Sequence, residues 1–494
     1  MSHWNLAAQI AGGAMRTSAT AARNLSNGIN AFTQGQGVRP SRRSLKRGIL
    51  VPGDGPPQGA RGTFLDYREV LVPAQLAALQ QGIFPLGRVQ DPGEDQPGFQ
   101  IALEWGFVER HVAVIGPSGS GKTYGILAPW IVAACASGLT TVAVDVKGDL
   151  HAQIRAAKAR LGVTTPIPTG IWDIDDPHGS MPWSPLSEVS SPQHAAQLAL
   201  AFLGDIDPGD NQKYFAERDH RWLRGLVWLA VNALGSDIHP SVLFKLIVSQ
   251  SYLASLASQA PHAAHELLDL VQQHPSDFTK ATAGLANRLS WLAEPGLADM
   301  LDGKSPRAFT LAKALDQGVL LIVGARERGG ERSATAAAVM LNLLRLRCLE
   351  RFGTNQVPVF WVLDEASRYA NRIQLDQMLD LLRGAGSPVC VAVQDVAHFG
   401  SQEDQSRMLT NCDTFITMPG VSPDTAMFFS RRLGRVSSPT TTMTMDPTGS
   451  WKPTLGHTER QLLGEREIMY PPVGQHGGVA QLRSGSPRPF LFSL

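Results

Sequence analysis

The residues with the clearest chemical potential form a glycine-rich loop that ends in lysine and threonine. Residues 116–123 read Gly-Pro-Ser-Gly-Ser-Gly-Lys-Thr and match the pattern G-x-x-x-x-G-K-[ST]. Glycines let backbone N–H groups turn inward toward phosphate oxygens, and the helix that follows presents its positive end to the same anion. An apolar stretch at 112–115 precedes the loop and a helical pattern at 124–137 follows it. The loop is therefore predicted to bind the phosphates of ATP.

Each position of the loop has a predicted role in this site. Lys122 is the predicted catalytic cation that reaches the β- and γ-phosphates, and the Thr123 hydroxyl is a predicted Mg²⁺ ligand. An ordinary Gly/Ser turn is the alternative interpretation, and the strand and helix patterns on either side disfavour it. The residues predicted to contact nucleotide are Gly116, Pro117, Ser118, Gly119, Ser120, Gly121, Lys122, Thr123 and Tyr124.

A pair of acidic residues supplies the second half of the predicted site. Asp364 and Glu365 directly follow the apolar run at 359–363, which is typical of a buried strand. Asp364 is predicted to hold Mg²⁺, directly or through water, and Glu365 to polarise the attacking water as the catalytic base. Many strands end in acids, so surface acids are the alternative; after a good phosphate loop, the consecutive pair favours an ATP hydrolase.

Two further candidates flank the apolar run at 389–393. Gln394 follows this run immediately, and a polar side chain at such a strand tip would lie near the γ-phosphate and report its presence. Arg383 precedes the run and would stabilise transition-state charge in the site of a neighbouring subunit. Solvated side chains are the alternative for both residues. The competing arginines for this role are Arg326, Arg328 and Arg332.

Length and composition indicate an ordinary globular protein with more than one structural unit. The chain has 494 residues, of which 43% are hydrophobic and 18% charged. A single core rarely grows beyond roughly 250–300 residues. The formal net charge of +1 neither favours nor excludes nucleic acid as a partner, because a DNA motor can grip its substrate along one narrow surface.

The cysteine spacing and the hydropathy pattern favour a cytoplasmic protein. Widely spaced cysteines predict neither a zinc site nor a disulfide framework, and buried free thiols are expected instead. No apolar run is long enough to cross a bilayer, and the N-terminus lacks the compact apolar core of a signal peptide. Contact with the inner membrane would therefore come through a partner. The cysteines are Cys135, Cys348, Cys390 and Cys412.

Alternating strand and helix patterns predict an α/β fold with a doubly wound, mostly parallel sheet and nucleotide at the carboxyl ends of its strands. The strand signal fades where long helical stretches begin, which predicts an all-α domain inserted into a discontinuous ATPase core. The first residues of the chain are predicted to form a flexible arm. This arm finishes with a basic cluster between Arg39 and Arg47 and a Pro/Gly-rich stretch. The predicted divisions are the arm at 1–60, a first core segment at 61–189, the inserted domain at 190–305 and a second core segment at 306–494.

In their order along the chain, these motifs resemble the TraG/TraD family of conjugative coupling proteins, the FtsK/HerA-like DNA-pumping ATPases of type IV secretion systems. The resemblance extends from about residue 85 to the C-terminus. Asp145-Val-Lys147-Gly-Asp149-Leu is similar to the family's Asp-Pro-Lys-Gly-Glu-Leu, with Val146 in place of proline. Whether Asp145, Lys147 and Asp149 touch nucleotide or only shape the strand end stays open. The other matching segments are 111–123, 183–186, 363–366, 383–386, 393–395, 410–414, 433–434 and 460–472.

The resemblance implies a RecA-like core with an inserted helical domain, assembled as a homo-hexameric ring. It implies ATP sites at subunit interfaces, Arg383 acting in trans, and DNA in a central channel. It also implies relaxase or relaxosome proteins and a type IV secretion channel or membrane subunit as partners. A monomer in the absence of DNA or ATP is the alternative state. Family members typically carry N-terminal transmembrane helices, and none is visible here.

Three functions are compatible with this sequence. The leading hypothesis is an ATP-driven DNA translocase that links a DNA substrate to a type IV secretion channel. The second keeps the motor but places it in DNA segregation, repair or defence. The third is a substrate-recruitment platform whose helical domain binds cargo while ATP stabilises the ring; the intact Asp364-Glu365 pair favours a turnover enzyme over this third function.

Overall fold

The computed structural model describes residues 72–73, 82–89, 100–204, 213–236, 238–353, 356–445, 451–471, 473, 477–483 and 486–494. The predicted arm at 1–60, including its basic cluster, lies outside the described residues. The chain divides into two compact units. Unit 1 contains the chain up to Ser137, Gln153–Thr164 and Cys390–Leu494, and unit 2 contains Gly138–Ala152 and Thr165–Val389.

The sheet of unit 1 places the phosphate-loop strand between two parallel neighbours. The strand β4 pairs in parallel with β9 on one side and with β10 on the other. Its four residues are fully buried and apolar, as expected of an inner strand of a parallel sheet. Beyond β10 the pairing becomes antiparallel, through β13, β14, β2, β3 and β1 in that order. These strands are β1 (Val72–Pro73), β2 (Ile83–Val89), β3 (Gln100–Glu104), β4 (Val112–Ile115), β9 (Val389–Val393), β10 (Thr414–Thr417), β13 (Gly477–Leu482) and β14 (Ser486–Ser493).

The helices of unit 1 are mostly short. Two of them, α17 and α18, begin at a serine whose hydroxyl accepts the N–H three residues on, at Ser401 and Ser422. The helices are α3 (Trp105–Val108), η4 (Lys122–Leu127), α4 (Ala128–Ala136), most of α5 (Leu150–Arg160), η11 (Val396–Phe399), α17 (Gln402–Thr410), α18 (Pro423–Leu433) and α19 (Glu465–Met469).

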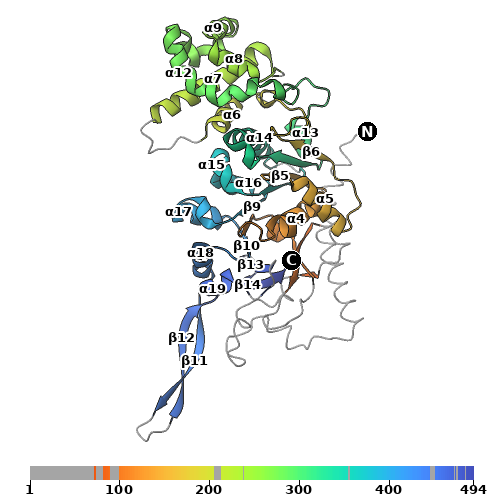
Figure 1. The fold of residues 1–494 in the computed structure, drawn as a ribbon, viewed down its shortest axis with the longest axis vertical. Helices are drawn as coiled ribbons and strands as arrows, with labels where there is room; N and C mark the ends of the chain where they lie inside the picture. The colour runs from red at the N-terminus through yellow and green to blue at the C-terminus, as the bar shows by residue number, and fades with distance from the viewer. Residues whose placement is uncertain are drawn as a thin grey trace. The chain divides into compact units, whose positions relative to one another are not determined.

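A long two-stranded ribbon leaves unit 1 after α18 (Figure 1). The strands β11 (Arg435–Met445) and β12 (Trp451–Gln461) pair antiparallel from Arg435 opposite Gln461 to Met445 opposite Trp451. No third strand joins this sheet among the described residues. The sequence patterns did not predict this ribbon.

Four strands of unit 2 pair in parallel with one another, in the order β8-β5-β7-β6. The inner strands are short apolar runs rich in β-branched residues, and β7 and β8 are buried along their whole length. The helices α13 (Leu311–Asp316) and α14 (Gly330–Glu350) pack against β5 and β7. The strands are β5 (Thr140–Asp145), β6 (Thr169–Trp172), β7 (Leu320–Gly324) and β8 (Val359–Leu363).

A helical segment separates β6 from β7 along the chain. The described residues between 173 and 319 form helices and turns and contain no strand. Polar side chains tie α6 to the rest of unit 2: His194 Nε2 lies 2.6 Å from Glu350 Oε1 on α14. The helices are η5 (Pro185–Glu188), α6 (Pro192–Leu203), α7 (Lys213–Leu234), α8 (Ser241–Val248), α9 (Gln250–Gln259), α10 (Pro261–Ala264), η6 (His265–Leu267), α11 (Leu268–Val271), α12 (Pro275–Leu289), η7 (Ser290–Ala293) and η8 (Pro295–Leu297). The predicted bounds of an inserted domain at 190–305 stay a prediction.

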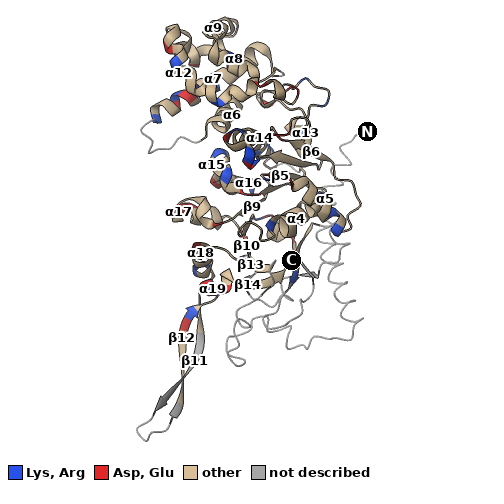
Figure 2. Cartoon of the chain, viewed as in Figure 1, with Lys and Arg blue, Asp and Glu red and all other residues tan. Residues whose placement is uncertain are grey.

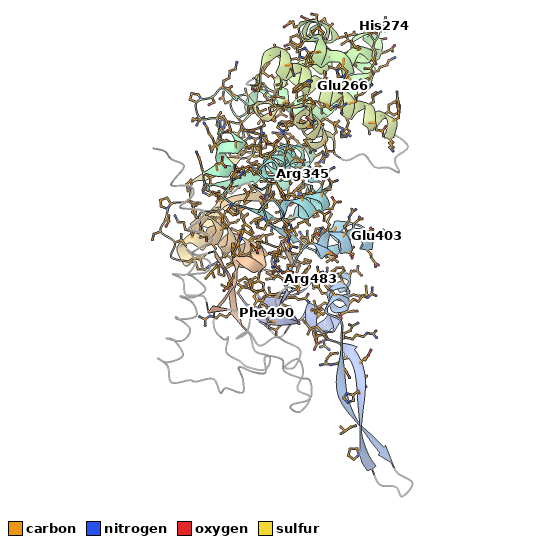
Figure 3. The ribbon with its side chains drawn as sticks, turned by 180° about the vertical axis from the view of Figure 1, so that it is seen from behind. Glu266, His274, Arg345, Glu403, Arg483 and Phe490 are labelled. Carbon is orange, nitrogen blue, oxygen red and sulfur yellow. The ribbon has the colours of Figure 1, made fainter. Side chains whose placement is uncertain are left out.

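Arg345 on α14 is a buried charge that joins several elements of unit 2 (Figure 3). Its guanidinium donates to the carbonyl oxygen of Ile373 at 3.1 Å and to the side-chain oxygens of Gln197 at 3.1 Å and Gln374 at 3.2 Å. A buried guanidinium is tolerated only when such acceptors surround it. The residue therefore holds α6 against α14 and the turn before α16 (Leu375–Leu382).

Charges on α7 are compensated locally rather than gathered into one basic face (Figure 2). Arg221 pairs with Asp269 at 2.5 Å, and Arg224 with Glu266 at 2.8 Å. Among the helices that the structure describes, none alone is long and apolar enough to cross a membrane; α8 and α9, bent by 112°, pass that test only as a pair. The expected free thiols are confirmed, with Cys348, Cys390 and Cys412 buried and Cys135 half-buried.

Candidate nucleotide-binding site

The phosphate loop begins where β4 ends, and its first residue is fixed by the neighbouring strand. Ile115 pairs with Val393 of β9, and the Gly116 N–H donates to the Val393 carbonyl oxygen at 3.1 Å. A Cβ atom on Gly116 would lie 2.5 Å from Met418 Cβ and 2.9 Å from Ser120 Oγ, so no larger residue fits there. Glycine at this position is therefore required by packing as well as by loop geometry.

The turn of the loop places a lysine and a serine inward. Gly119 and Gly121 have φ angles of +80° and +94°, which L-residues with side chains rarely adopt. Lys122 is only 6% exposed, and its ammonium donates to the carbonyl oxygen of Gly116 and, at 3.1 Å, to that of Pro117. Ser120 Oγ is buried and has no hydrogen-bond partner in the part of the chain that the structure describes. A buried cation and an unpartnered hydroxyl in one loop suit an anion with several oxygen acceptors.

The helix after the loop opens with a wide turn. The Ala128 N–H donates to the Thr123 carbonyl oxygen, a five-residue spacing, and Lys122–Leu127 form a π-helix before α4 starts. Pro129 explains the change, because it has no N–H for the carbonyl four residues earlier and its ring crowds that carbonyl. Tyr124 lies in this turn, 58% exposed, with the Arg160 guanidinium 4.0 Å from its ring centroid. This cation–π contact gives the exposed ring a fixed neighbour.

Gln394 leaves β9 beside the start of the loop, because the residue before it, Val393, accepts from Gly116. The following Asp395 holds this segment in place. Its carboxylate accepts from the Ala397 N–H at 2.8 Å and from Thr425 Oγ1 at 3.0 Å. Although partial burial would raise the pKa of Asp395, these hydrogen bonds and one from Ser422 outweigh it and lower that pKa. Asp395 is therefore an anionic anchor for the strand tip that carries Gln394.

The acidic pair ends β8 in unit 2. Asp364 is 8% exposed, and its Oδ1 accepts the Glu365 N–H at 2.9 Å. Glu365 has φ +47° and ψ +44°, a left-handed conformation that is uncommon for a residue with a side chain. Strain of this kind persists only where neighbouring contacts enforce it, and it is concentrated at functional sites.

The buried side chain of Tyr369 stabilises the turn that contains Asp364 and Glu365. Its hydroxyl donates to the Asp364 carbonyl oxygen at 2.9 Å, and its ring is 1% exposed. Burial, with the negative charges of Asp364 and Glu365 adding to it, raises the pKa of Tyr369 well above its ordinary value. The phenol is therefore a permanent hydrogen-bond donor in this position.

The Asp145–Leu150 motif lies next to the acidic pair, at the end of the neighbouring strand. Lys147 Nζ lies 3.7 Å from Glu365 Oε1. The Asp145 carboxylate accepts backbone N–H groups from Gly148 at 2.7 Å and Leu150 at 3.1 Å. Burial raises the pKa of Asp145 above its ordinary value, against the effect of these hydrogen bonds. The motif therefore shapes the strand end and brings a lysine to Glu365.

The predicted arginines have different surroundings. Arg383 is exposed at the C-terminal end of α16. Arg326 is half-buried and ion-paired with Asp173, with Asp176 Oδ2 at 3.8 Å, and Arg332 pairs with Glu294 at 3.5 Å. Arg328 is exposed beside them. Arg326 and Arg332 are thus held by acids within unit 2, which leaves Arg383 and Arg328 as the more accessible guanidinium groups.

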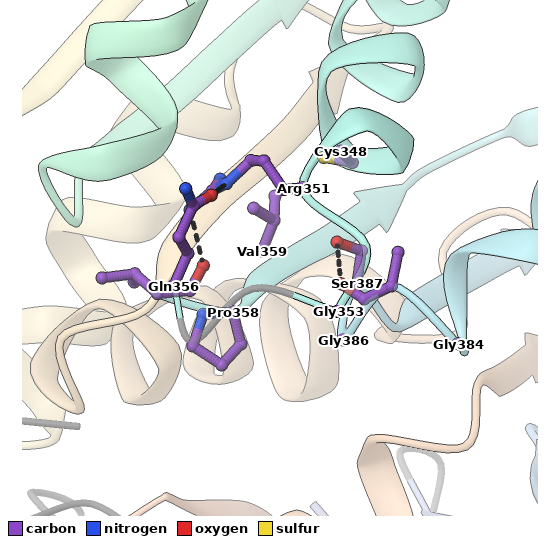
Figure 4. Close-up of a pocket in the computed structure, with 11 residues that line it drawn as sticks. Cys348, Arg351, Gly353, Gln356, Pro358, Val359, Gly384, Gly386 and Ser387 are labelled. Atoms are coloured by element: carbon purple, nitrogen blue, oxygen red, sulfur yellow. Dashed lines mark hydrogen bonds between the residues drawn. The ribbon is translucent and has the colours of Figure 1, made fainter. Parts of the chain in front are cut away.

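The loop after Arg383 lines a pocket of about 380 Å³ at the amino end of β8 (Figure 4). The Trp361 N–H donates to the Pro388 carbonyl oxygen at 2.9 Å, which ties this loop to the strand. The acidic pair lies at the other end of β8. Five strand residues span roughly 16 Å. Arg383 therefore lies near the amino end of β8, and Glu365 of the same chain lies at its carboxyl end. The pocket residues are Cys348, Arg351, Gly353, Gln356, Val357, Pro358, Val359, Gly384, Ala385, Gly386 and Ser387.

The structure thus groups the predicted site residues by unit. The loop, Lys122, Thr123 and Gln394 belong to unit 1, whereas Asp364, Glu365 and Arg383 belong to unit 2. Sequence reasoning missed Tyr369, Asp395 and the contact of Lys147 with Glu365. Each of these residues lies in or beside a motif already singled out, but none carries a pattern that predicts its partner.

The residues present suit a nucleotide phosphate with Mg²⁺. The loop offers a buried ammonium, the unpartnered Ser120 hydroxyl and backbone in the conformation that turns N–H groups inward. Among the described residues no group of three or more His, Cys, Asp or Glu gathers to hold a metal. Mg²⁺ in phosphate sites is commonly held by one or two protein oxygens together with the phosphates and water, so a cluster of this kind is not required.

Comparison with known proteins places the chain in a family. A family model described as the type IV secretion-system coupling protein DNA-binding domain matches residues 99–451. No curated protein of similar sequence was found.

Solved structures share its fold. The bacterial conjugative coupling protein TrwBdeltaN70 in its unbound monoclinic form is 17% identical, with a TM-score of 0.60 over 80% of this chain and 86% of that one. The plasmid coupling protein TrwB in complex with ADP and Mg²⁺ is 17% identical, with a TM-score of 0.59 over 84% and 96%. TrwB in complex with the ATP analogue ADPNP is 17% identical, with a TM-score of 0.55 over 77% and 83%. The predicted RecA-like α/β fold with a mostly parallel sheet is thereby confirmed, and the chain belongs to the type IV secretion-system coupling protein family.

Proposed function

We propose that this chain is an ATP-driven DNA translocase that links a DNA substrate to a type IV secretion channel. The observation that carries the proposal is the loop at 116–123. Lys122 is buried there, follows two glycines with positive φ, and donates to the carbonyl oxygens of Gly116 and Pro117. Such a loop has little purpose other than holding an anion. Family membership and the TrwB complexes with ADP and Mg²⁺ and with ADPNP support ATP and Mg²⁺ as the ligands.

In the proposed site the chain's residues divide the work. Backbone N–H groups of Ser118, Gly119 and Gly121 and the Lys122 ammonium bind and orient the phosphates, with Pro117 and Tyr124 at the edge of the loop. Thr123 and Asp364 would hold Mg²⁺, whose charge neutralises the phosphates when it is bound. Glu365 takes a proton from the attacking water, Gln394 senses the outermost phosphate, and Arg383 of a neighbouring copy stabilises developing charge.

The position of Arg383 supports an assembly in which sites form between copies. Because Arg383 and Glu365 lie at opposite ends of β8, an Arg383 side chain that reaches an acidic pair would reach that of another chain. We propose a homo-hexameric ring with DNA in its channel, which forms from monomers when ATP or DNA is present. Relaxase or relaxosome proteins and a membrane subunit of the secretion channel are the proposed partners, and the cytoplasmic side of the inner membrane is the proposed location.

An ATPase assay with single-stranded DNA, double-stranded DNA and no DNA tests the proposal. The wild-type chain should hydrolyse ATP faster when DNA is added, and its mass should rise to that of a hexamer with ATP and DNA. Absence of hydrolysis under every DNA condition would overturn it. A hydrolysis rate that DNA does not change, together with capture of a relaxase, would favour the recruitment platform instead.

A further inference from the structure

We propose that Lys147 is a positioning residue that restrains Glu365 until the site is engaged. The inference rests on the proposed function, in which Glu365 accepts a proton from water. It starts from the contact of Glu365 with a residue outside the predicted site, the ion pair between Lys147 Nζ and Glu365 Oε1 at 3.7 Å.

Strand pairing brings the two residues together. β5 and β8 are parallel neighbours, with Val144 opposite Leu363, so the residues that follow each strand emerge side by side. Lys147 and Glu365 both lie within the first few residues after this pair. Their proximity therefore follows from the sheet register and not from a chance meeting of long side chains.

The backbone of Lys147 is held on both sides. Asp145 Oδ1 accepts the Lys147 N–H at 3.2 Å and the Gly148 N–H at 2.7 Å, which closes a tight turn around the lysine. Gly148 has φ +82°, and a Cβ atom there would lie 3.1 Å from the guanidinium of Arg326. Arg326 is itself ion-paired with Asp173. The Lys147 side chain thus extends from a fixed backbone. The fold itself therefore directs it toward Glu365.

Glu365 needs an external contact to stay where it is. Its left-handed backbone conformation is disfavoured for a residue with a side chain, and its carboxylate is largely shielded, with 16% of the side chain exposed. The ammonium of Lys147 compensates the carboxylate charge in this position. At the same time the ammonium lies beside the carboxylate oxygen that would otherwise accept a proton from water.

The restraint is weak enough to be released. The Lys147 side chain is 45% exposed, and an exposed ion pair shifts an equilibrium by only about twofold to fivefold. Any anion that engages Lys147 would free Glu365. Loss of Lys147 should therefore raise turnover in the absence of DNA, lower the ratio of DNA-stimulated to basal turnover, and leave the KM for ATP unchanged.

Hydrogen exchange of the nucleotide-free chain tests the contact without any activity. In Lys147→Ala, backbone amides of residues 365–369 should exchange about threefold faster than in the wild type at low salt. Lys147→Arg should restore the wild-type rate, and Lys313→Ala, at an exposed lysine of the same unit, should not change it. Raising the salt concentration should remove the difference, because screening weakens the pair in the wild type. Equal exchange in Lys147→Ala and wild type at low salt would overturn the proposal.

Turnover is the second readout. Basal kcat should rise about threefold in Lys147→Ala and return to the wild-type value in Lys147→Arg. An unchanged or lower basal kcat in Lys147→Ala, with an active wild type, would overturn the proposed restraint of Glu365. The proposed ATPase function would be unaffected by that result. If the wild type itself hydrolyses nothing, the proposed function fails, and hydrogen exchange still decides whether Lys147 holds the turn.

Discussion

The hydroxyl of the fully buried Tyr369 donates a 2.9 Å hydrogen bond to the carbonyl oxygen of Asp364. Five residues apart in the chain, the two close the turn in which Glu365 adopts its left-handed conformation. In the proposed site, Tyr369 thus fixes the backbone of the residue that would hold Mg²⁺.

Tyr369→Phe should therefore weaken both the fold and the proposed activity. It removes a buried hydrogen bond worth about 1–2 kcal/mol, and should lower the melting temperature by about 2–6 °C. ATP turnover should fall several-fold because Asp364 and Glu365 lose their fixed backbone. Thermal melts and ATPase rates check this, with Tyr470→Phe, at a 67% exposed tyrosine, as the control. Identical melts for Tyr369→Phe and wild type would show that the hydrogen bond has no role.

The central strands could be predicted from sequence because buried parallel strands are short apolar runs bounded by turn residues. Apolar or β-branched runs predict strands at 112–115, 140–145, 319–323, 359–363, 389–393 and 414–417. All match observed strands, with the one at 319–323 shifted by one residue. The antiparallel strands were missed. β13, which begins Gly-Gly and ends Gln-Leu, and β2, with Pro85 and Gly87 inside it, carry few β-branched residues, and tertiary pairing decides their conformation.

The helical segment between β6 and β7 shows a second limit of prediction from sequence. The pattern at 262–273 predicts one helix, and the structure breaks it into α10, η6 and α11, because apolar spacing continues through a 3₁₀ turn. Within the site, motif spacing gave Lys122 and Asp364 as candidates. The contact between Lys147 and Glu365 depends on which strands are neighbours and in what register, which a single sequence does not contain.

Lys122→Ala tests the phosphate loop. It removes the buried cation that would lie against the phosphates, so ATP affinity should fall at least about tenfold and turnover should become undetectable. Fluorescent-nucleotide titration and an ATPase assay measure the two effects. Lys280→Ala removes a lysine whose side chain is 80% exposed and should match the wild type. Wild-type affinity in Lys122→Ala would place the nucleotide elsewhere.

Glu365→Gln separates binding from chemistry. The amide keeps the size of the side chain but cannot accept a proton, so turnover should fall about 10²–10⁴-fold while ATP affinity stays within a few-fold of the wild type. Single-turnover hydrolysis and equilibrium binding measured side by side check this. Glu403→Gln, at an exposed glutamate of α17, serves as the matched control. A large loss of affinity together with turnover would mean that Glu365 acts on binding instead.

Asp395 gives a prediction that depends on pH. Its folded-state pKa is lowered, so ionised Asp395 stabilises the fold above its unfolded pKa of about 3.9, and this contribution disappears as pH falls through the lower folded-state pKa. Asp395→Asn should melt about 1–2 °C below the wild type near neutral pH, a small shift because the carboxylate is only half-buried. The gap should begin to narrow below about pH 4 and close as pH falls through the lower folded-state pKa. Melting curves across pH test this against Asp299→Asn, at an exposed aspartate; a gap independent of pH would exclude the charge as its cause.

Arg383→Ala tests whether sites form between copies. Loss of an arginine that acts on transition-state charge should lower turnover about 10³-fold. ATP binding should persist, because Arg383 lies at the end of β8 opposite Glu365. Arg407→Ala, at a 59% exposed arginine of α17, is the control.

Mixing variants distinguishes action in trans from action within one chain. Arg383→Ala supplies intact loops and Lys122→Ala supplies intact arginines, so random co-assembly should restore up to about a quarter of wild-type turnover from two inactive proteins. Turnover should rise with the mixing ratio and peak near equal amounts. If no mixture regains activity although mass measurements show mixed rings, the arginine acts on its own chain or is replaced in this role by Arg328, and Arg328→Ala with Lys122→Ala would then be the complementing pair.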